Sequence, residues 1–61
     1  MYKIELLEDE NILKSKELND YESTFSCLNG LIKYLINNNR KIVIYKKDNN
    51  IWTKFGEWKL Q

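Results

Sequence analysis

Few residues in this sequence could carry out acid–base or nucleophilic chemistry. The chain has no histidine, the side chain that most often moves protons near neutral pH, and it has a single cysteine. Cys27 lies beside Leu28 and Leu31 in a helical pattern of apolar residues, so we interpret it as a small buried thiol and not as an activated nucleophile. The sequence therefore predicts no catalytic residue, and we expect the protein not to be an enzyme.

The acidic residues do not have the spacing of a metal site. Glu8, Asp9 and Glu10 are consecutive, and we expect a solvated turn that cannot hold two acids in a dry pocket. A calcium-binding loop starting at Asp9 would place Leu13 at a ligand position and Lys14 where glycine is needed. One cysteine without histidine makes neither a zinc site nor an internal disulfide, and the two glycines stand far apart. We expect no metal and no cofactor.

Length, composition and charge predict one small domain that spans residues 1–61. The chain has room for one hydrophobic core, and its hydrophobic content of 43% is enough to fill that core. The net charge of +1 comes from ten basic and nine acidic residues spread along the chain, which gives no steering field for a polyanion. No apolar run approaches the roughly 20 residues that cross a bilayer, and the first residues do not resemble a signal peptide. We therefore expect a cytoplasmic protein without membrane contact.

The first third of the chain predicts a β-hairpin. Residues 2–7 alternate in the manner of a half-buried strand, and the polar residues 8–11 supply a turn. Residues 12–18 then return as a second strand, with Ile12, Lys14, Lys16 and Leu18 at alternate positions. A helix across residues 5–18 is the alternative, because leucine, glutamate and lysine favour helices. We prefer the hairpin, since the acidic cluster would fall within that helix and interrupt its apolar stripe.

The middle of the chain predicts an amphipathic helix. Asn19 followed by Glu22 has the form of a capping box, and residues 37–39 are asparagines that suit a helix C-cap. Gly30 would lie on the outward face, where it costs on the order of 1 kcal/mol relative to alanine. Close approach of a partner would explain this glycine, and a tolerated substitution would explain it equally well. The predicted apolar stripe consists of Tyr21, Phe25, Leu28, Leu31, Ile32, Leu35 and Ile36.

The last third predicts a second hairpin. Residues 40–47 alternate as a strand, the asparagines at 49 and 50 form a two-residue loop, and residues 51–60 return. This loop places Ile44 opposite Phe55, Lys46 opposite Thr53 and Lys47 opposite Trp52. A bulge at Gly56 would bring Trp58 and Leu60 back to the core side. The predicted fold class is therefore α+β: a ββαββ two-layer sandwich, with one amphipathic helix packed on a four-stranded antiparallel sheet.

The sheet face turned away from the helix is the surface that we expect to bind a partner. A single helix covers one face of a sheet, so aromatic and lysine side chains on the other face have nothing above them. If Ile42, Ile44 and Phe55 face the helix, Val43 points away from it. The residues predicted to bind a partner there are Tyr45, Trp52, Lys41, Lys47 and Lys54. Alternatively, the lysine stems cover the rings and simply shield the sheet.

Three functions fit such a face. Tyrosine and tryptophan are frequent hot spots in protein interfaces, whereas single-stranded nucleic acid needs a stronger basic field than a net charge of +1 provides. A homodimer or larger homo-oligomer could use the face, or an exposed strand edge, as its own interface. The frequent lysine, asparagine, isoleucine and tyrosine are encoded by AT-rich codons. Our hypothesis is therefore a non-enzymatic phage or mobile-element accessory protein that inhibits or redirects a host protein, such as a defence nuclease.

Overall fold

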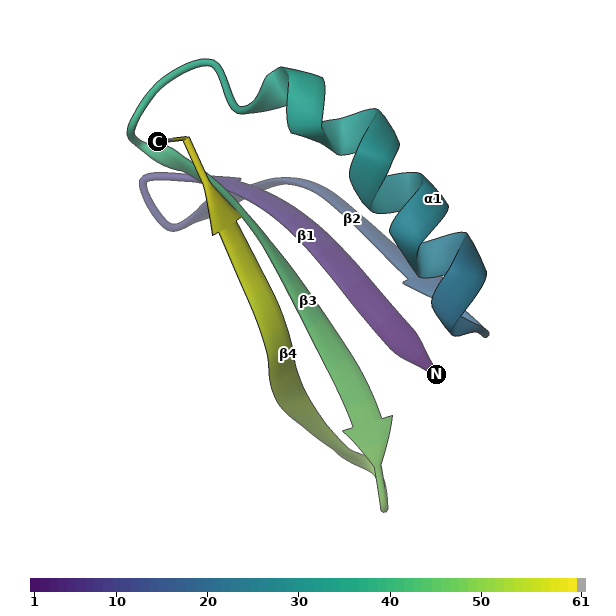
Figure 1. Cartoon of the computed structure of the whole chain (residues 1–61). Coiled ribbons are helices and arrows are strands. Elements are labelled where there is room, and N and C mark those ends of the chain that lie inside the picture. The colour runs from purple at the N-terminus through teal and green to yellow at the C-terminus, as the bar shows by residue number, and fades with distance from the viewer. Residues whose placement is uncertain (61) are drawn as a thin grey trace.

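The computed structural model describes residues 1–60 and has the predicted ββαββ order. Four strands form one antiparallel sheet, and a single helix packs against one of its faces (Figure 1). The order of the strands across the sheet is β2-β1-β3-β4, so β2 and β4 are the two edges. The elements are β1 (Tyr2–Glu8), β2 (Asn11–Leu18), α1 (Tyr21–Leu31), the 3₁₀ turn η1 (Ile32–Tyr34), β3 (Arg40–Asp48) and β4 (Ile51–Lys59). The α+β fold class and the N-terminal hairpin are thus confirmed, and the helix considered for residues 5–18 is wrong.

Both hairpins close through two residues with positive φ. In the β3–β4 loop, Asn49 and Asn50 have φ values of 51° and 64°, as a tight asparagine turn requires. The β1–β2 loop has the same form, with φ values of 51° at Asp9 and 68° at Glu10. Glutamate is an unusual residue in this conformation, and here its carboxylate accepts a hydrogen bond from Lys41 Nζ at 3.0 Å. The acidic cluster is therefore a tight turn that is linked to β3.

Helix α1 begins one residue later than the sequence suggested and ends earlier. Asp20, not Asn19, is the N-cap, because its Oδ1 accepts a hydrogen bond of 2.7 Å from the backbone N–H of Ser23. This bond lowers the pKa of the Asp20 carboxyl below its usual value. The α-helix stops at Leu31 and continues as η1, so the predicted helical stripe does not extend to Ile36.

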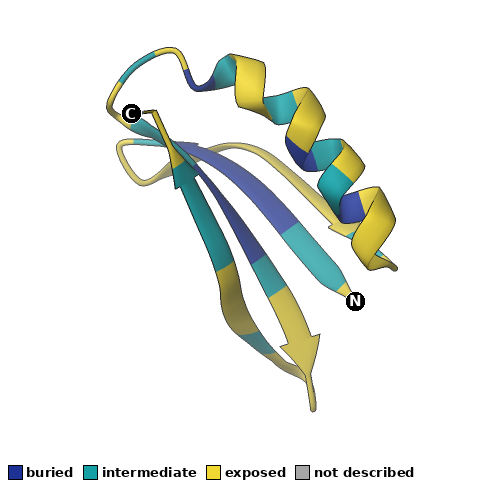
Figure 2. Ribbon diagram, in the orientation of Figure 1, coloured by how far each residue is buried: buried dark blue, intermediate teal, exposed yellow. Residues whose placement is uncertain are grey.

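The hydrophobic core lies between α1 and the two central strands (Figure 2). The predicted apolar stripe is correct for Leu28 and Leu35, which are buried. It is wrong for Tyr21, Ile32 and Ile36, whose exposed fractions are 50%, 45% and 67%. The buried residues of the core cluster are Ile4, Leu6, Leu28, Leu35, Ile42 and Ile44.

Thr24 lies on the buried face of the helix, although the predicted apolar stripe did not include it. It is buried, and its hydroxyl donates a hydrogen bond of 2.7 Å to the backbone carbonyl of Asp20. A threonine can be buried here because the bond satisfies its polar atom within the helix itself. The face of α1 that packs on the core is therefore narrower than the predicted apolar stripe, and it includes one polar residue.

Two register shifts change which residues face the helix. The β1–β2 register shifts between Leu6 and Leu7, so Ile12 pairs with Leu7 on the face away from α1. The prediction that Ile12 shares a face with Lys14 and Lys16 is therefore wrong, because one extra residue reverses the alternation.

The second shift lies in the β3–β4 ladder and confirms the expected bulge near Gly56. Ile44 pairs with Gly56, not with Phe55 as predicted, whereas Lys46 pairs with Thr53 and Lys47 with Trp52 as predicted. The bulge returns Trp58 to the helix side, where it packs against the core. Leu60, predicted to follow it, is 44% exposed.

Helix α1 covers the β1–β2 half of the sheet more than the β3–β4 half. The hairpin of β3 and β4 leans away from α1, and its tip projects past the N-terminus of β1 (Figure 1). Pairing of β1 with β3 ends near the backbone bond from Lys47 N–H to the Met1 carbonyl, 2.9 Å long. Residues 46–51 are all exposed. Within residues 1–60, no helix has the length and apolar content needed to span a membrane.

Candidate functional site

Four of the five predicted partner-binding residues lie together on the open face of the sheet, toward the tip of the β3–β4 hairpin. Tyr45 is paired with Lys54, and Lys47 is paired with Trp52. Paired residues of an antiparallel ladder point to the same side, so these four side chains share one face. The pairing follows from the two-residue loop at Asn49 and Asn50. We call Tyr45, Lys47, Trp52 and Lys54 the hairpin site.

The aromatic rings of the hairpin site are half-buried beneath lysine side chains. Lys3 of β1 places its Nζ 5.1 Å from the ring centroid of Tyr45 and 4.9 Å from that of Trp52. Lys47 Nζ lies 5.5 Å from the Trp52 centroid. Cations at these distances are attracted to the negative face of an aromatic ring. Lysine ammonium groups therefore lie over the half-buried rings, which is the geometry of the alternative in which lysine side chains cover the face.

Lys3 of β1 contacts the hairpin site, and the sequence reasoning missed this contact. The alternation of residues 2–7 predicted that Lys3 and Ile4 point to opposite faces of the sheet. It did not predict that Lys3 lies near Tyr45, because that depends on the order of the strands across the sheet. In the structure β1 lies next to β3, and Lys3 is paired with Tyr45. Its Nζ also lies 3.8 Å from Glu5 Oε2, which partly offsets its charge.

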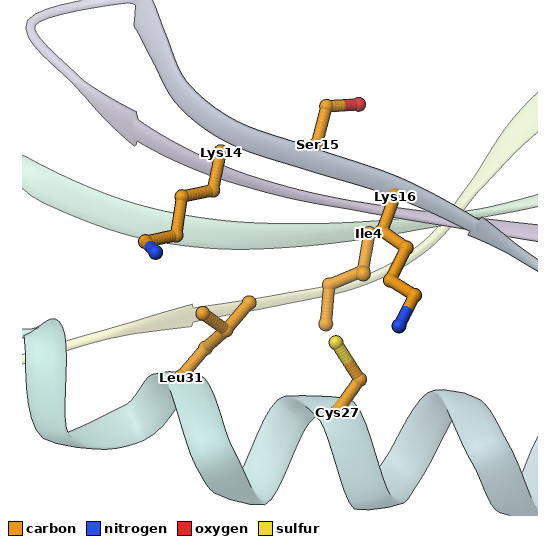
Figure 3. Close-up of a pocket in the computed structure, with 6 residues that line it drawn as sticks. All are labelled: Ile4, Lys14, Ser15, Lys16, Cys27 and Leu31. Carbon is orange, nitrogen blue, oxygen red and sulfur yellow. The ribbon is translucent and has the colours of Figure 1, made fainter.

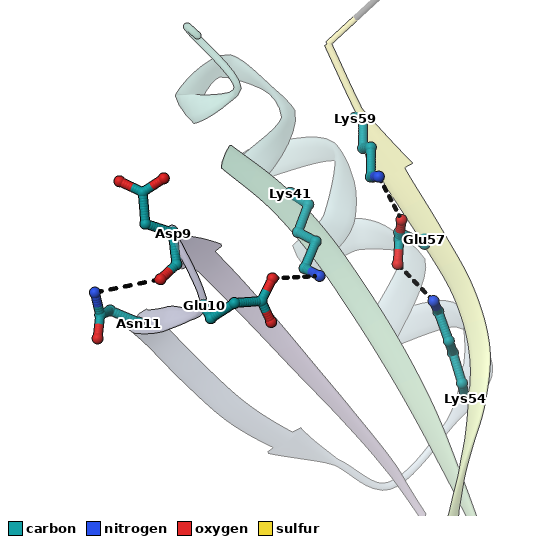
Figure 4. Close-up of polar contacts among 7 residues, drawn as sticks. All are labelled: Asp9, Glu10, Asn11, Lys41, Lys54, Glu57 and Lys59. Carbon is teal, nitrogen blue, oxygen red and sulfur yellow. Dashed lines mark hydrogen bonds and ion pairs between the residues drawn. The ribbon is translucent and has the colours of Figure 1, made fainter. Parts of the chain in front are cut away.

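Lys41 does not belong to the hairpin site. It is on the same face of β3, but it pairs with Leu7 and Lys59 at the far end of the strand. Its Nζ donates a hydrogen bond to Glu10 in the β1–β2 turn (Figure 4), and this bond raises the pKa of Lys41 above its usual value. Lys41 therefore links a turn to the sheet: it lies on the predicted face, but at the other end of β3 from the residue paired with Trp52.

The middle of the open sheet face is shielded from solvent although no helix or strand covers it. Val43 is only 3% exposed, although no helix lies above it. Its cross-strand neighbours are Glu5 on β1 and Glu57 on β4, and these larger side chains flank it. The open face is therefore a mixed layer of apolar and charged side chains, with its aromatic rings confined to one end.

Lys54 shares a carboxylate with another lysine of β4. Both Lys54 and Lys59 form ion pairs with Glu57, and the Lys59 pair has a length of 3.2 Å (Figure 4). The hydrogen bond from Lys54, followed by that from Lys59, lowers the pKa of the Glu57 carboxyl. At the same end of the sheet as Lys59, Arg40 Nε donates a 2.9 Å hydrogen bond to Glu8 and lowers the pKa of that carboxyl as well. These pairs balance much of the lysine charge on the sheet.

Acid should destabilise the protein through these carboxylates. Because the pKa values of Glu8, Asp20 and Glu57 are lowered by folding, their stabilising effect is complete above the usual carboxyl range and is lost as pH falls through the folded-state values. We expect the urea midpoint to stay level from pH 7 to about pH 5 and to decrease at lower pH. Glu57→Gln should lower the midpoint at pH 7 and reduce its acid dependence. A midpoint that rises as the pH falls would contradict this assignment.

A second group of aromatic rings lies on the helix side and was not predicted as a group. Tyr21 of α1 is 4.6 Å from Phe25 and 6.0 Å from Phe55, measured between ring centroids. Tyr2 of β1 is 5.8 Å from Phe55, and Phe25 is 6.4 Å from Trp58. Edge-to-face and tilted contacts of this kind stabilise a fold. They join the start of α1 to β4, the strand that the helix covers least.

A groove separates α1 from the edge strand β2 (Figure 3). Ile4 lies at its floor, Cys27 and Leu31 project into it from α1, and Lys14 and Lys16 reach over it from β2. The cavity has a volume of about 370 Å³. Cys27 is half-buried here, so the fully buried thiol that we expected is partly accessible. Across residues 1–60, no three cysteine or carboxylate side chains come together in a way that could hold a metal ion.

Comparison with models of protein families, with curated proteins and with solved structures found no match for this chain.

Proposed function

We propose that this protein is a non-enzymatic module that binds another protein through the hairpin site. The observation that carries the proposal is the position of Tyr45 and Trp52 near the end of a projecting hairpin, held in place by Lys3 and Lys47. Tyrosine, tryptophan and basic residues dominate the binding energy of many protein interfaces. Rings that are already fixed lose little side-chain entropy when a partner docks. The site is therefore suited to a protein surface.

Charge and ring accessibility favour a protein partner over single-stranded nucleic acid. A base that stacks on a ring needs that ring's face, and here Lys3 lies against both rings of the site. Glu5 and Glu57 lie on the same face and offset its lysines, whereas nucleic-acid affinity depends largely on the number of phosphates neutralised. A partner protein that places carboxylates near Lys3 and Lys47 meets both requirements.

The biological setting that we propose rests on size and composition. A chain of 61 residues with a strong bias toward lysine, asparagine and isoleucine is typical of an accessory gene in an AT-rich genome, such as that of a phage or mobile element. A protein of this kind acts by occupying a surface of a host protein, for example a defence nuclease. The hairpin site supplies the surface for this inhibitory or redirecting role.

Replacing both rings should abolish capture of the partner. We expect Tyr45→Ala with Trp52→Ala to weaken binding by about 700-fold, since hot-spot residues contribute about 2 kcal/mol or more each, or about 4 kcal/mol for the two. The measurement is affinity capture from nuclease-treated bacterial lysate, followed by titration of the captured protein. Tyr21→Ala is the matched control, because Tyr21 is an exposed ring on the helix side of the molecule.

The milder variant Lys47→Glu tests the same site with less risk to the fold, since Lys47 is exposed. We expect it to slow association and to lower affinity for a partner with carboxylates at the interface. Full binding by the folded double variant would refute the proposal. Capture that disappears with nuclease, or a steep salt dependence of binding to a labelled oligothymidylate, would favour nucleic acid instead.

A further inference from the structure

The edge strand β2 offers a free ladder of backbone hydrogen-bonding groups. It pairs with β1 on one side only, and no described strand lies on its other side. Residues 11–17 are all exposed. An uncovered edge of this length readily accepts another extended chain as an added strand. In this molecule the edge runs beside the groove that β2 forms with α1.

The groove continues along the edge as a second hollow toward the start of α1. The first hollow has an apolar floor of Ile4, Cys27 and Leu31. The second is lined by Lys16 and Leu18 from β2, and by Glu22, Ser23, Ser26 and Cys27 from α1. Strand and helix thus form two walls of one elongated depression. A strand added at the edge would lie along it.

The β2 rim of this groove is basic, whereas Glu22 lines its α1 side near the start of the helix. Lys14 and Lys16 point from β2 toward α1, whereas Ser15 between them points to the other face (Figure 3). Neither lysine is within ion-pair distance of a carboxylate among residues 1–60. Lys14 instead lies over the ring of Tyr34, whose centroid is 5.2 Å from its Nζ. Both ammonium groups are therefore free to pair with an incoming acid.

The same lysines oppose occupation of the edge by a second copy of this chain. Two copies of β2 related by a two-fold axis would pair antiparallel, with residues equally distant from the axis facing each other. An axis at Lys14 or Lys16 places that lysine opposite itself, and an axis at Ser15 places Lys14 opposite Lys16. An axis at Glu17 opposes two glutamates. Like charges directly opposite each other destabilise a strand pair, so these four registers are unfavourable for a second copy and more favourable for a chain of opposite charge.

We propose that β2 and α1 form a binding groove for an extended acidic peptide segment of a partner protein, which adds to the sheet as a fifth strand beside β2. Backbone hydrogen bonds to β2 would supply affinity, and carboxylates opposite Lys14 and Lys16 would fix the register. The residues of β2 on the open face near these lysines are Ser15 and Glu17, so the segment should be uncharged on that side. Alternation of acidic and uncharged residues is therefore the expected pattern of the ligand. This groove lies at the opposite sheet edge from β4, and its occupation does not require the hairpin site.

The test uses blocked peptides of about seven residues, which is the usual length of a strand. We expect a peptide of alternating valine and glutamate to bind the full chain with a Kd between about 10 and 1000 μM, measured by NMR titration. Shifted amides should cluster in β2 and on the side of α1 that lines the groove. A peptide with lysine in place of glutamate, and one with central prolines that lack the N–H donor, should bind at least about tenfold more weakly.

Substitutions of the rim lysines distinguish recognition of charge from non-specific binding. Lys14→Gln with Lys16→Gln should weaken the glutamate peptide about tenfold, and Lys14→Glu with Lys16→Glu should transfer the preference to the lysine peptide. Lys46→Gln is the control, because Lys46 is exposed on β3, which β1 separates from β2, and it does not line the groove. Cys27 gives an independent readout: as the only thiol, its reaction with Ellman's reagent should slow when the glutamate peptide is bound.

The groove proposal would be overturned by equal binding of the glutamate and lysine peptides, by unchanged affinity in the folded rim variants, or by no binding at millimolar peptide. Shifts confined to Tyr45 and Trp52 would also overturn it, because they would assign the acidic peptide to the hairpin site. Conversely, the Tyr45→Ala, Trp52→Ala variant should bind the glutamate peptide normally. The two proposals can therefore fail separately.

Discussion

Alanine at position 56 should destabilise the fold by about 1 to 3 kcal/mol, the usual cost of placing extra atoms in a packed region. A Cβ on Gly56 would lie 2.6 Å from Cη2 of the Trp58 indole and 3.0 Å from Cζ3. The indole therefore rests directly on the Gly56 backbone, and a methyl group there would push it outward. Trp58 also packs against the core and the ring of Phe25, so its displacement would loosen the contact between β4 and α1. Urea denaturation would measure the loss.

Gly30→Ala is the matched control for this prediction. Apart from its chain neighbours and the backbone of its own helix, no atom lies within 4 Å of a Cβ built on Gly30, which is exposed and helical. The same substitution should therefore stabilise the protein by about 0.5 to 1 kcal/mol, because alanine favours the helix. A second test combines Gly56→Ala with Trp58→Leu, where the cost of the alanine should shrink because the clashing ring is gone. Equal effects of alanine at 30 and 56 would contradict the close contact.

The contrast between the two glycines shows what sequence reasoning could predict. Gly56 in a strand pattern indicated a bulge, and the structure confirms the register shift there. Gly30 left two explanations, close approach of a partner and a tolerated substitution, and the open space around it within this chain fits both. Local chemistry identifies a glycine that the backbone or a ring requires. It cannot identify a glycine that has no close neighbours, because both kinds of glycine interrupt the sequence pattern in the same way.

The element order was predictable because each strand and turn carries its own local signal. Alternation in residues 40–47 and the asparagines at 49 and 50 fixed a hairpin and most of its register, and therefore the pairing of Lys47 with Trp52. The same signals could not reveal that Phe55 is the residue left out of the ladder. The local energy of a bulge differs little between neighbouring positions of β4. The packing of Trp58 on Gly56 is the contact that selects one of these positions.

The candidate site was less predictable because it depends on which strands are neighbours. The face that carries Tyr45 and Trp52 followed from alternation alone. The place of β1 beside β3 did not, and it is this neighbour that brings Lys3 over both rings. The groove between β2 and α1 likewise depends on where the helix crosses the sheet. Long-range arrangement is thus what separates the hairpin site in the structure from the bare aromatic face that the pattern suggested.

Ile42→Ala should leave much of the protein unfolded at 25 °C. Ile42 is 0% exposed, lies on a central strand and pairs with Leu6 on one side and Trp58 on the other. Truncation of a buried isoleucine to alanine costs about 2 to 5 kcal/mol, and a domain of this size seldom has more than about 3 to 5 kcal/mol of stability from its core. The loss is therefore comparable to the whole stability. Circular dichroism and the dispersion of amide NMR signals would report it.

Ile51→Ala is the control that separates core packing from strand preference. Ile51 is also an isoleucine in a strand, at the tip of the β3–β4 hairpin, but it is 65% exposed. We expect its substitution to change stability by less than about 0.5 kcal/mol. If Ile42→Ala remained folded with a loss below about 1 kcal/mol, the small core would not be the source of the stability. The β3–β4 hairpin would then have to be stable without its contacts to the core. Because the rings of the hairpin site sit on the same two strands that Ile42 anchors, we instead expect partner binding and folding to be lost together in this variant.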